Sequence, residues 1–232
     1  MTDEHVLSRA LIESGGVAAM VAKAAPDLRL LTEAERAASL RATLEARPPG
    51  DAWLFGYGSL IWNPTIHSVE RRTARVEGWH RAFCLSIRAG RGTMDKPGLV
   101  LGLDAGGSCT GIAFRIAEDV LEGELSLLWR REMLAGSYVP RWLDVLDPNG
   151  GRFGSAITFT IDRSCEQYAG TLARDVIVQR LATASGVLGS AADYLFRTRD
   201  WLRAQGIPDP ELERLAAHVE AAQAVLRGGG GP

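Results

Sequence analysis

The middle of this 232-residue chain alternates apolar and polar residues with a period of two, whereas both ends have helical patterns. Ile112, Phe114 and Ile116 alternate with smaller or polar residues, and residues 157–161 repeat the arrangement. A period of two is that of a half-buried strand, because successive side chains point to opposite faces. Similar runs occur at residues 52–55, 72–77, 80–87, 99–103 and 139–146. The block from 51 to 162 therefore predicts a sheet or a small barrel.

Short clusters of turn residues separate these predicted strands. They lie at residues 90–92, 96–98, 105–107 and 147–151, and each contains glycine, a residue that turns favour because it adopts positive φ without a steric cost. One helical segment, residues 117–134, interrupts the strands. Because helices do not alternate with the strands, the pattern favours an α+β fold and disfavours a doubly wound dinucleotide-binding fold.

The segment before the strands has helical signals. Thr32 and Glu35 form a capping-box pattern ahead of Leu40 and Leu44, which have helical spacing. The sequence Pro-Pro-Gly at residues 48–50 ends that segment. We therefore expect residues 1–50 to form a helical N-terminal extension.

The segment after the strands is helical as well. Ser190 is an N-cap candidate with Asp193 three residues on, and Gly206 ends that helix. Pro210 is then expected at the first position of the next helix. The sequence predicts a single domain over residues 51–227, which we expect to be catalytic, and a flexible tail over residues 228–232.

Composition and charge exclude several classes of protein. The chain is 46% hydrophobic and 23% charged, which is typical of a globular protein and not of a disordered one. Its net charge of −2 provides no basic excess for nucleic acid or an anionic membrane. It has no run of about 18 apolar residues, and its first residues are acidic where a signal peptide is basic. We expect a protein that acts without nucleic acid or membrane.

Cysteine and histidine patterns disfavour a metal site. Cys84, Cys109 and Cys165 are odd in number and widely spaced, which disfavours a disulfide framework or a cysteine-rich zinc site and fits a reducing cytoplasm. The four histidines never fall three or four residues apart, so no helical metal pair is predicted. We expect any chemistry to depend on carboxylates, hydroxyls and backbone groups.

Residues 55–62, Phe-Gly-Tyr-Gly-Ser-Leu-Ile-Trp, take an apolar strand into a turn with two glycines. Such glycines let the backbone approach a ligand and direct N–H groups at an anion or a carbonyl oxygen. The dinucleotide fingerprint is excluded because Ile61 stands where a third glycine is required, and no phosphate loop occurs. Two hypotheses remain, a plain structural turn and a loop that binds something other than a nucleotide.

A carboxylate continues the apolar stripe of the predicted helix 117–134. The stripe consists of Leu121, Leu125, Leu128 and Glu132. Arg130 and Arg131 are expected to point elsewhere. Burial of Glu132 without a partner would cost several kcal/mol or raise its pKa. Either it pairs with a core arginine or lies where the stripe reaches the surface, or it is a carboxyl group suited to proton transfer near neutral pH.

Other polar candidates have weaker signals. Tyr168 is either a hydroxyl donor in a site or a tyrosine at the rim of the core. Arg88, Arg91 and Arg141 either pair with a substrate carboxylate or are solvated in loops.

The segments with these candidates resemble the ChaC-like γ-glutamylcyclotransferases, in particular the glutathione-specific branch. The resemblance covers roughly residues 51–205 and rests on residues 55–62, 91–93, 96–98, 109–115, 129–133, 167–170 and 193–195. The sequence departs from the family at 136–138, Gly-Ser-Tyr where Gly-Gly-Tyr is common, and at 187–192, where polar residues are usual. Residues 1–50 have no counterpart in the shortest members.

The resemblance implies a small mixed β-barrel flanked by helices and a cofactor-independent lyase. The reaction it implies cleaves glutathione, a small-molecule substrate, to 5-oxoproline and cysteinylglycine when the γ-glutamyl α-amine attacks its own side-chain carbonyl. Glu132 would be the general acid and base. The implied substrate-binding residues are Tyr57, Gly58, Ser59, Leu60, Arg91, Tyr138 and Tyr168. The protein would be a monomer or a homodimer.

Two alternatives stay open. One is a relative that acts on γ-glutamyl amines or γ-glutamyl amino acids. The other is a non-catalytic binding or regulatory module, because the family has been linked to cation transport regulation. A pure binding module has little reason to keep a costly carboxylate on an apolar stripe, so Glu132 favours an enzyme.

Overall fold

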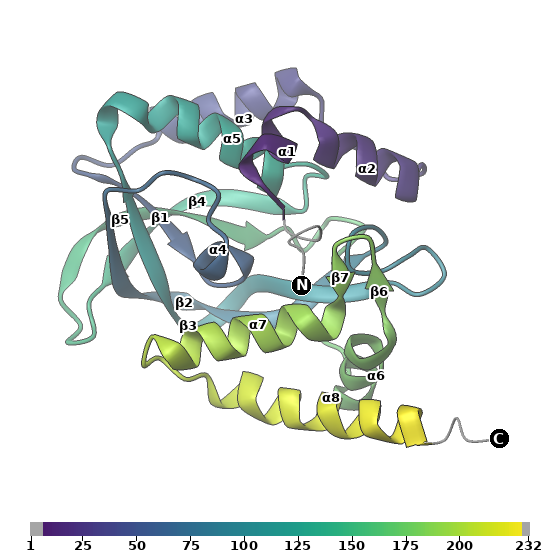
Figure 1. The fold of residues 1–232 in the computed structure, drawn as a ribbon. Helices are drawn as coiled ribbons and strands as arrows, with labels where there is room; N and C mark the ends of the chain where they lie inside the picture. Colours follow the sequence, from purple (N-terminus) through teal and green to yellow (C-terminus); the bar gives the residue numbers. More distant parts are fainter. Residues whose placement is uncertain (1–6, 229–232) are drawn as a thin grey trace.

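The computed structural model describes residues 7–228 and contains a closed five-stranded barrel (Figure 1). The strands are β1 (Ala52–Gly56), β2 (Glu70–Ile87), β3 (Gly98–Ile116), β4 (Tyr138–Leu146) and β5 (Arg152–Ile161). Their order around the barrel is β1-β3-β2-β4-β5. Strand β1 closes the barrel by pairing in parallel with β5, whereas the other barrel pairs are antiparallel. The predicted α+β class with a mixed barrel is confirmed.

Strands β2 and β3 form one long antiparallel hairpin, where the sequence predicts four short strands and a turn at residues 105–107. Gly78, Gly106 and Gly107 have φ values of 78°, 104° and 69°. They lie where the pairing register shifts, and therefore form a bulge that bends the hairpin. The predicted turn is wrong because glycines suited to reversing the chain serve here to bend it.

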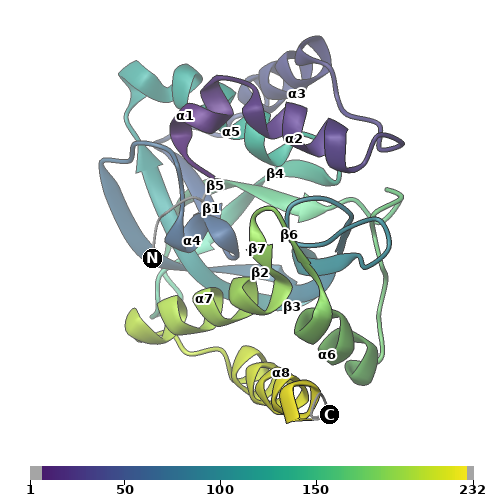
Figure 2. The ribbon, with the colours of Figure 1, turned by 45° about the vertical axis from the view of Figure 1, so that its right-hand side comes forward.

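Helices cover two sides of the barrel (Figures 1 and 2). On one side lie α1 (Arg9–Glu13), α2 (Gly16–Ala24), α3 (Glu33–Glu45) and α5 (Leu121–Glu132), the last preceded by a 3-10 turn, Glu118–Val120. On the other lie α6 (Arg174–Thr183), α7 (Ala191–Ala204) and α8 (Pro210–Gly228). A short helix, α4 (Ser59–Trp62), follows β1, and the hairpin of β6 (Ser185–Gly186) and β7 (Gly189–Ser190) precedes α7.

The predicted helix caps are confirmed at both ends of the fold. Thr32 and Glu35 form a reciprocal capping box on α3, and Ser190 and Asp193 form one on α7. Each box satisfies backbone donors that a helix N-terminus otherwise leaves open. Helix α7 ends just before Gly206, whose φ of 73° is one that glycine adopts readily.

Helix α8 starts at Pro210 as predicted, and Asp209 caps it by accepting from the backbone of Glu211 and Leu212. Gly228 is the last residue of this helix, so the first residue of the predicted tail is helical. Residues 229–232 lie outside the described residues, as do residues 1–6 of the N-terminal extension.

The N-terminal helices pack on α5. Ile12 of α1 and Val17 of α2 form a small apolar cluster with Leu127 of α5 and Leu134 just after it. The extension is thereby joined to the helix that ends at Glu132. Within residues 7–228, no helix has both the length and the apolar character that crossing a bilayer requires.

Candidate active site

Glu132 is the last residue of α5 and lies at the end of a buried stripe. Leu121, Leu125 and Leu128 are 6%, 0% and 0% exposed, so the predicted stripe faces the core. The side chain of Glu132 is 13% exposed. Helical spacing along α5 therefore brings a carboxyl group to the edge of the apolar core.

Arg131 is buried and paired with Glu132, which corrects the expectation that it points elsewhere. Its Nε lies 2.8 Å from Glu132 Oε1, and its side chain is 3% exposed. Its Nη2 donates to Ser59 Oγ at 2.9 Å, and Nη1 donates to the Asn63 carbonyl and to Thr65 Oγ1. One arginine thus joins the carboxyl group to the loop after β1, and the pairing of Glu132 with a core arginine is observed.

Burial nevertheless raises the pKa of Glu132 above its ordinary value, against the opposing charge of Arg131. The ion pair therefore does not exclude the second hypothesis, a carboxyl group suited to proton transfer. Three tyrosines surround the group. Burial raises the pKa of Tyr57 and Tyr138 well above 10 and that of Tyr194 to about 12, and the charge of Glu132 adds to each rise. At neutral pH these tyrosines are neutral hydroxyls beside one acidic group.

The loop at residues 57–60 connects β1 to α4 and faces the same place. The Tyr57 hydroxyl donates to the Phe159 carbonyl at 2.8 Å, which fixes the ring inside the barrel. Gly58 has φ −126°, outside the left-handed region. A Cβ on Gly58 would lie 2.6 Å from the Tyr194 hydroxyl oxygen. Glycine is required here because of close packing and not because of its backbone angle.

A cavity of about 210 Å³ opens beside Glu132. A smaller pocket of about 20 Å³ adjoins it, and Ser59, Glu132, Tyr138 and Tyr194 line both. The smaller pocket reaches buried residues of the loop, among them Tyr57, Gly58 and Leu60. The structure therefore brings the loop, Glu132 and Tyr138 together, although they are far apart in the sequence.

Arg91 lines the larger cavity from the β2–β3 connection. Its guanidinium lies 5.5 Å from the ring centre of Tyr194 and 5.9 Å from that of Trp62. It donates to the Ser190 carbonyl at 2.9 Å, and burial lowers its pKa. Because a guanidinium starts from a very high pKa, Arg91 stays a cation despite this lowering. It lies in the cavity wall, held by two aromatic rings and by the N-cap residue of α7.

Three of the other candidates lie elsewhere. The Tyr168 hydroxyl donates to Asp104 Oδ2 at 2.8 Å, and Tyr168 lines neither pocket. Arg88 pairs with Asp27 and Glu166. Arg141 lies over the Trp79 ring and donates to Thr160.

Arg131, Tyr194 and Leu7 are site residues that sequence reasoning missed. Tyr194 lies in one of the segments that carry the family resemblance, and this signal could have identified it. Arg131 also lies in such a segment, at residues 129–133, but its angle on the helix predicts that it points away from Glu132. Leu7 lines the larger cavity from the N-terminal extension, and no pattern in the sequence identifies it.

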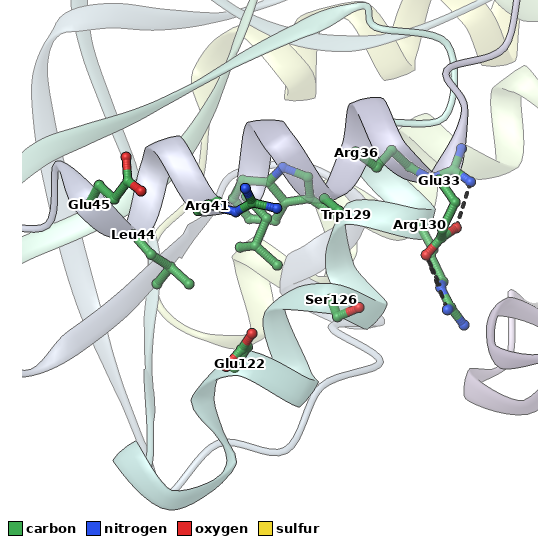
Figure 3. Close-up of a pocket in the computed structure, with 11 residues that line it drawn as sticks. Glu33, Arg36, Arg41, Leu44, Glu45, Glu122, Ser126, Trp129 and Arg130 are labelled. Atoms are coloured by element: carbon green, nitrogen blue, oxygen red, sulfur yellow. Dashed lines mark hydrogen bonds and ion pairs between the residues drawn. The ribbon is translucent and has the colours of Figure 1, made fainter.

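A larger hollow of about 460 Å³ lies between α3 and α5, on the outside of the molecule (Figure 3). Glu33 at its edge pairs with both Arg36 and Arg130. The hydrogen bond from Arg36 lowers the pKa of Glu33, opposite in sign to the shift at Glu132. This groove is larger than the cavity beside Glu132, but its Glu33 is already paired with two arginines and has a lowered pKa, so the chemistry favours the smaller cavity.

Among the described residues, no group of three or more His, Cys, Asp or Glu side chains could hold a metal ion. Cys84 and Cys109 are buried and unpaired, and burial raises the pKa of Cys84 to about 12. A thiol with that pKa is a poor nucleophile. The arrangement is suited to proton transfer by Glu132 beside hydroxyl and backbone donors.

Comparisons with known proteins agree with the predicted resemblance. A family model described as ChaC-like protein matches residues 52–222. A relative from Escherichia coli (strain K12), named glutathione-specific gamma-glutamylcyclotransferase, is 48% identical over 193 residues, which cover 82% of this chain and 83% of the relative. A Homo sapiens relative, glutathione-specific gamma-glutamylcyclotransferase 1, is 28% identical over 181 residues, 77% of this chain and 81% of the relative.

A solved structure has a similar fold. A crystal structure of a γ-glutamyl cyclotransferase specific to glutathione from yeast superposes with a TM-score of 0.67 at 20% identity. The alignment covers 75% of this chain and 97% of that one. The match to the family model spans both the loop at 57–60 and Glu132. The chain therefore belongs to the ChaC-like protein family.

Proposed function

We propose that this protein is a glutathione-specific γ-glutamylcyclotransferase, a lyase that converts glutathione to 5-oxoproline and cysteinylglycine. The observation that carries the proposal is Glu132, a buried carboxyl group with a raised pKa in a cavity that faces the loop at 57–60. The names of the relatives from Escherichia coli and Homo sapiens support the same activity.

The reaction is a ring closure within the substrate. The α-amine nitrogen attacks the γ-carbonyl carbon and forms the C–N bond of a five-membered ring. The amide bond to the cysteine nitrogen then breaks, and a proton moves from the α-amine to that nitrogen. Atoms balance without water, metal or redox cofactor. Holding the substrate curled contributes up to about 7–11 kcal/mol, the upper limit for oriented intramolecular reactions.

Glu132 performs both proton transfers. As a carboxylate it accepts a proton from the α-amine nitrogen as the ring forms, and as a carboxylic acid it donates that proton to the departing cysteine nitrogen. A raised pKa suits both roles, because general acid–base catalysis is most effective when the pKa of the group is near the working pH. Arg131 pairs with the carboxylate form and fixes its orientation.

The loop and the surrounding side chains bind the substrate. Backbone N–H groups at Gly58 and its neighbours stabilise the negative charge that develops on the γ-carbonyl oxygen. The hydroxyl of Tyr138 is a neutral donor beside Glu132. Arg91, farther out in the larger cavity, pairs with a carboxylate of the substrate. Tyr168 has no place in this binding scheme, since its hydroxyl is engaged by Asp104.

We expect the protein to work in the cytoplasm, where its three unpaired thiols stay reduced. Its substrate is a small molecule.

The proposal is tested by measuring 5-oxoproline after incubation of purified protein with glutathione and, separately, with γ-glutamylalanine. We expect more 5-oxoproline from glutathione than from γ-glutamylalanine. N-acetylglutathione is the matched control, because its blocked α-amine cannot close the ring, and it should release no cysteinylglycine. Product from γ-glutamylalanine alone would favour a γ-glutamyl amino acid cyclotransferase. No product from either substrate would favour a binding or regulatory module.

A further inference from the structure

A buried arginine outside the cavity holds the backbone of the active-site loop. Arg81 on β2 has a side chain that is 6% exposed. Its Nε donates to the Tyr57 carbonyl at 2.7 Å, and its Nη2 donates to the Thr110 carbonyl at 2.6 Å. Its Nη1 donates to Asp209 Oδ2 at 2.5 Å. The three nitrogens of the guanidinium thus bond to three segments of the chain.

Asp209 connects this arginine to the start of α8. One carboxylate oxygen accepts from Arg81, and the other accepts from the backbone N–H groups of Glu211 and Leu212. Its side chain is 21% exposed. A buried guanidinium requires a counter-charge, and Asp209 is the carboxylate that pairs with Arg81 among the described residues. Helix α8 thereby supplies the group that keeps Arg81 in place.

The bond to the Tyr57 carbonyl determines where the next N–H group points. The chain has no cis peptide bond among the described residues. In a trans peptide the C=O and the following N–H point in opposite directions. Arg81 holds the Tyr57 carbonyl on its own side, so the Gly58 N–H faces away from Arg81. Gly58 lines the pocket that Glu132 also lines, and among residues 7–228 no hydrogen-bond acceptor for its N–H is found.

We propose that Arg81 is a positioning residue for the cyclotransferase reaction, oriented by Asp209, and that it aims the Gly58 N–H at the substrate carbonyl. This inference rests on the proposed function for its effect on catalysis. It does not require Arg81 to touch the substrate, and it gives α8 a role in catalysis beyond covering the barrel.

Two substitutions separate positioning from packing. Asp209→Asn keeps a side chain that caps α8, because asparagine is as good an N-cap as aspartate, but it removes the charge that holds Arg81. Arg81→Gln removes the guanidinium group. Arg81→Lys keeps the positive charge, but its single ammonium group can take the place of the guanidinium at only one of the three partners. The matched control is Glu213→Gln, which breaks the ion pair between α8 and Arg203 of α7 without contact to the loop.

With glutathione as substrate, Asp209→Asn and Arg81→Gln should lower kcat by about tenfold or more, as loss of one aligned transition-state donor does. KM should change by less than about threefold, because the affected donor acts mainly on the developing negative charge. Arg81→Lys should recover part of the loss, and Glu213→Gln should match the wild type. Unchanged kcat in folded Asp209→Asn and Arg81→Gln would overturn the proposal.

The Gly58 amide resonance in a ¹⁵N-labelled sample gives a readout that does not depend on activity. It should move in Asp209→Asn and Arg81→Gln and stay in place in Glu213→Gln. A Gly58 resonance that is unchanged in the first two variants would overturn the positioning role, whether or not the wild type acts on glutathione. A wild type without cyclotransferase activity but with a Gly58 resonance that moves would refute the proposed function and leave the positioning of Gly58 supported.

Discussion

Glu132 is subject to two opposing influences, burial and the charge of Arg131, and burial dominates. A carboxyl group with a raised pKa in the folded state stabilises the protein fully below its unfolded value, near 4.5, and loses that contribution as the pH rises through the folded value. Glu132→Gln should therefore equal the wild type in melting temperature at pH 4 and exceed it at pH 8. A lower melting temperature at pH 8 would mean that the pair with Arg131 dominates instead.

The same shift predicts the pH dependence of activity. The proposed mechanism requires the base form of Glu132, so kcat/KM for glutathione should fall on the acid side with a pKa above 4.5. A pH–rate profile from pH 4 to 8 measures this limb. An acid limb below pH 4.5 would contradict the role of burial.

Gly58 and Ser59 are neighbours whose substitutions should have different effects. Gly58→Ala places a methyl group 2.6 Å from the Tyr194 hydroxyl oxygen, so either the loop or Tyr194 must move. We expect a large rise in KM and a fall in kcat. Ser59→Ala removes an acceptor from buried Arg131 and should cost about 1–3 kcal/mol of unfolding free energy, with a smaller kinetic effect. Kinetics and melting temperature measured on both variants test this, and a Gly58→Ala variant with lower stability and normal kinetics would remove the loop from the active site.

At the scale of elements, the N-terminal extension forms part of the cavity wall. Leu7 lines the cavity, and its carbonyl accepts from Asn63 Nδ2 at 2.9 Å. Two residues on, Arg9 donates to Glu124 Oε2 on α5 at 2.7 Å. Burial acts to raise the pKa of Glu124, but the bonds from Arg9 and the His67 N–H bring it below its ordinary value. The wall is thus fastened to the helix that carries Glu132.

Arg9→Ala should release this part of the wall. Because the pKa of Glu124 is lowered in the folded state, the pair stabilises the protein above about pH 4.5 and loses its effect as the pH falls through the folded value. At pH 7 we expect a loss of about 1–3 kcal/mol, less than for a fully buried pair because Arg9 is 33% exposed. KM should rise with little change in kcat. Arg29→Ala, which breaks an exposed pair with Glu35, is the control, and an Arg9→Ala variant indistinguishable from it would contradict the account.

Elements also explain where sequence reasoning succeeds and fails. Period-two patterns and capping boxes are local, so the strands of the barrel and the starts of α3 and α7 could be predicted. A glycine pair such as residues 106–107 can form either a turn or a bulge. Only the pairing between strands β2 and β3 distinguishes the two. The angle of Arg131 on the helix predicts its direction wrongly, because a long side chain at the last turn of a helix can reach around the helix to Ser59.

At the scale of the whole molecule, the site is assembled from segments that no local pattern connects. The stripe on α5 and the glycines of the loop mark two parts of it, and the family resemblance adds Arg91 and Tyr138. Closure of the barrel by β1 and β5 brings these parts together. Leu7 enters only because α1 and α2 pack on α5. Tyr168 lies within a segment that carries the family resemblance, but its hydroxyl is bonded to Asp104.

The whole molecule should work without a metal ion. The sequence has no ligand spacing for one, and ring closure needs only proton transfer and oxyanion stabilisation. Activity on glutathione should therefore survive dialysis against EDTA with no more than a minor change. Activity lost in EDTA and restored by one specific metal would contradict this expectation.

The most direct test of the account is the rate at which Glu132→Gln forms 5-oxoproline from glutathione. Glutamine keeps the shape of the side chain but cannot transfer the proton. We predict that kcat falls by at least about 10²-fold, while glutathione binding, measured by calorimetry, is largely retained. A folded Glu132→Gln variant with near wild-type kcat would contradict the assignment of Glu132 as the group that performs the chemistry.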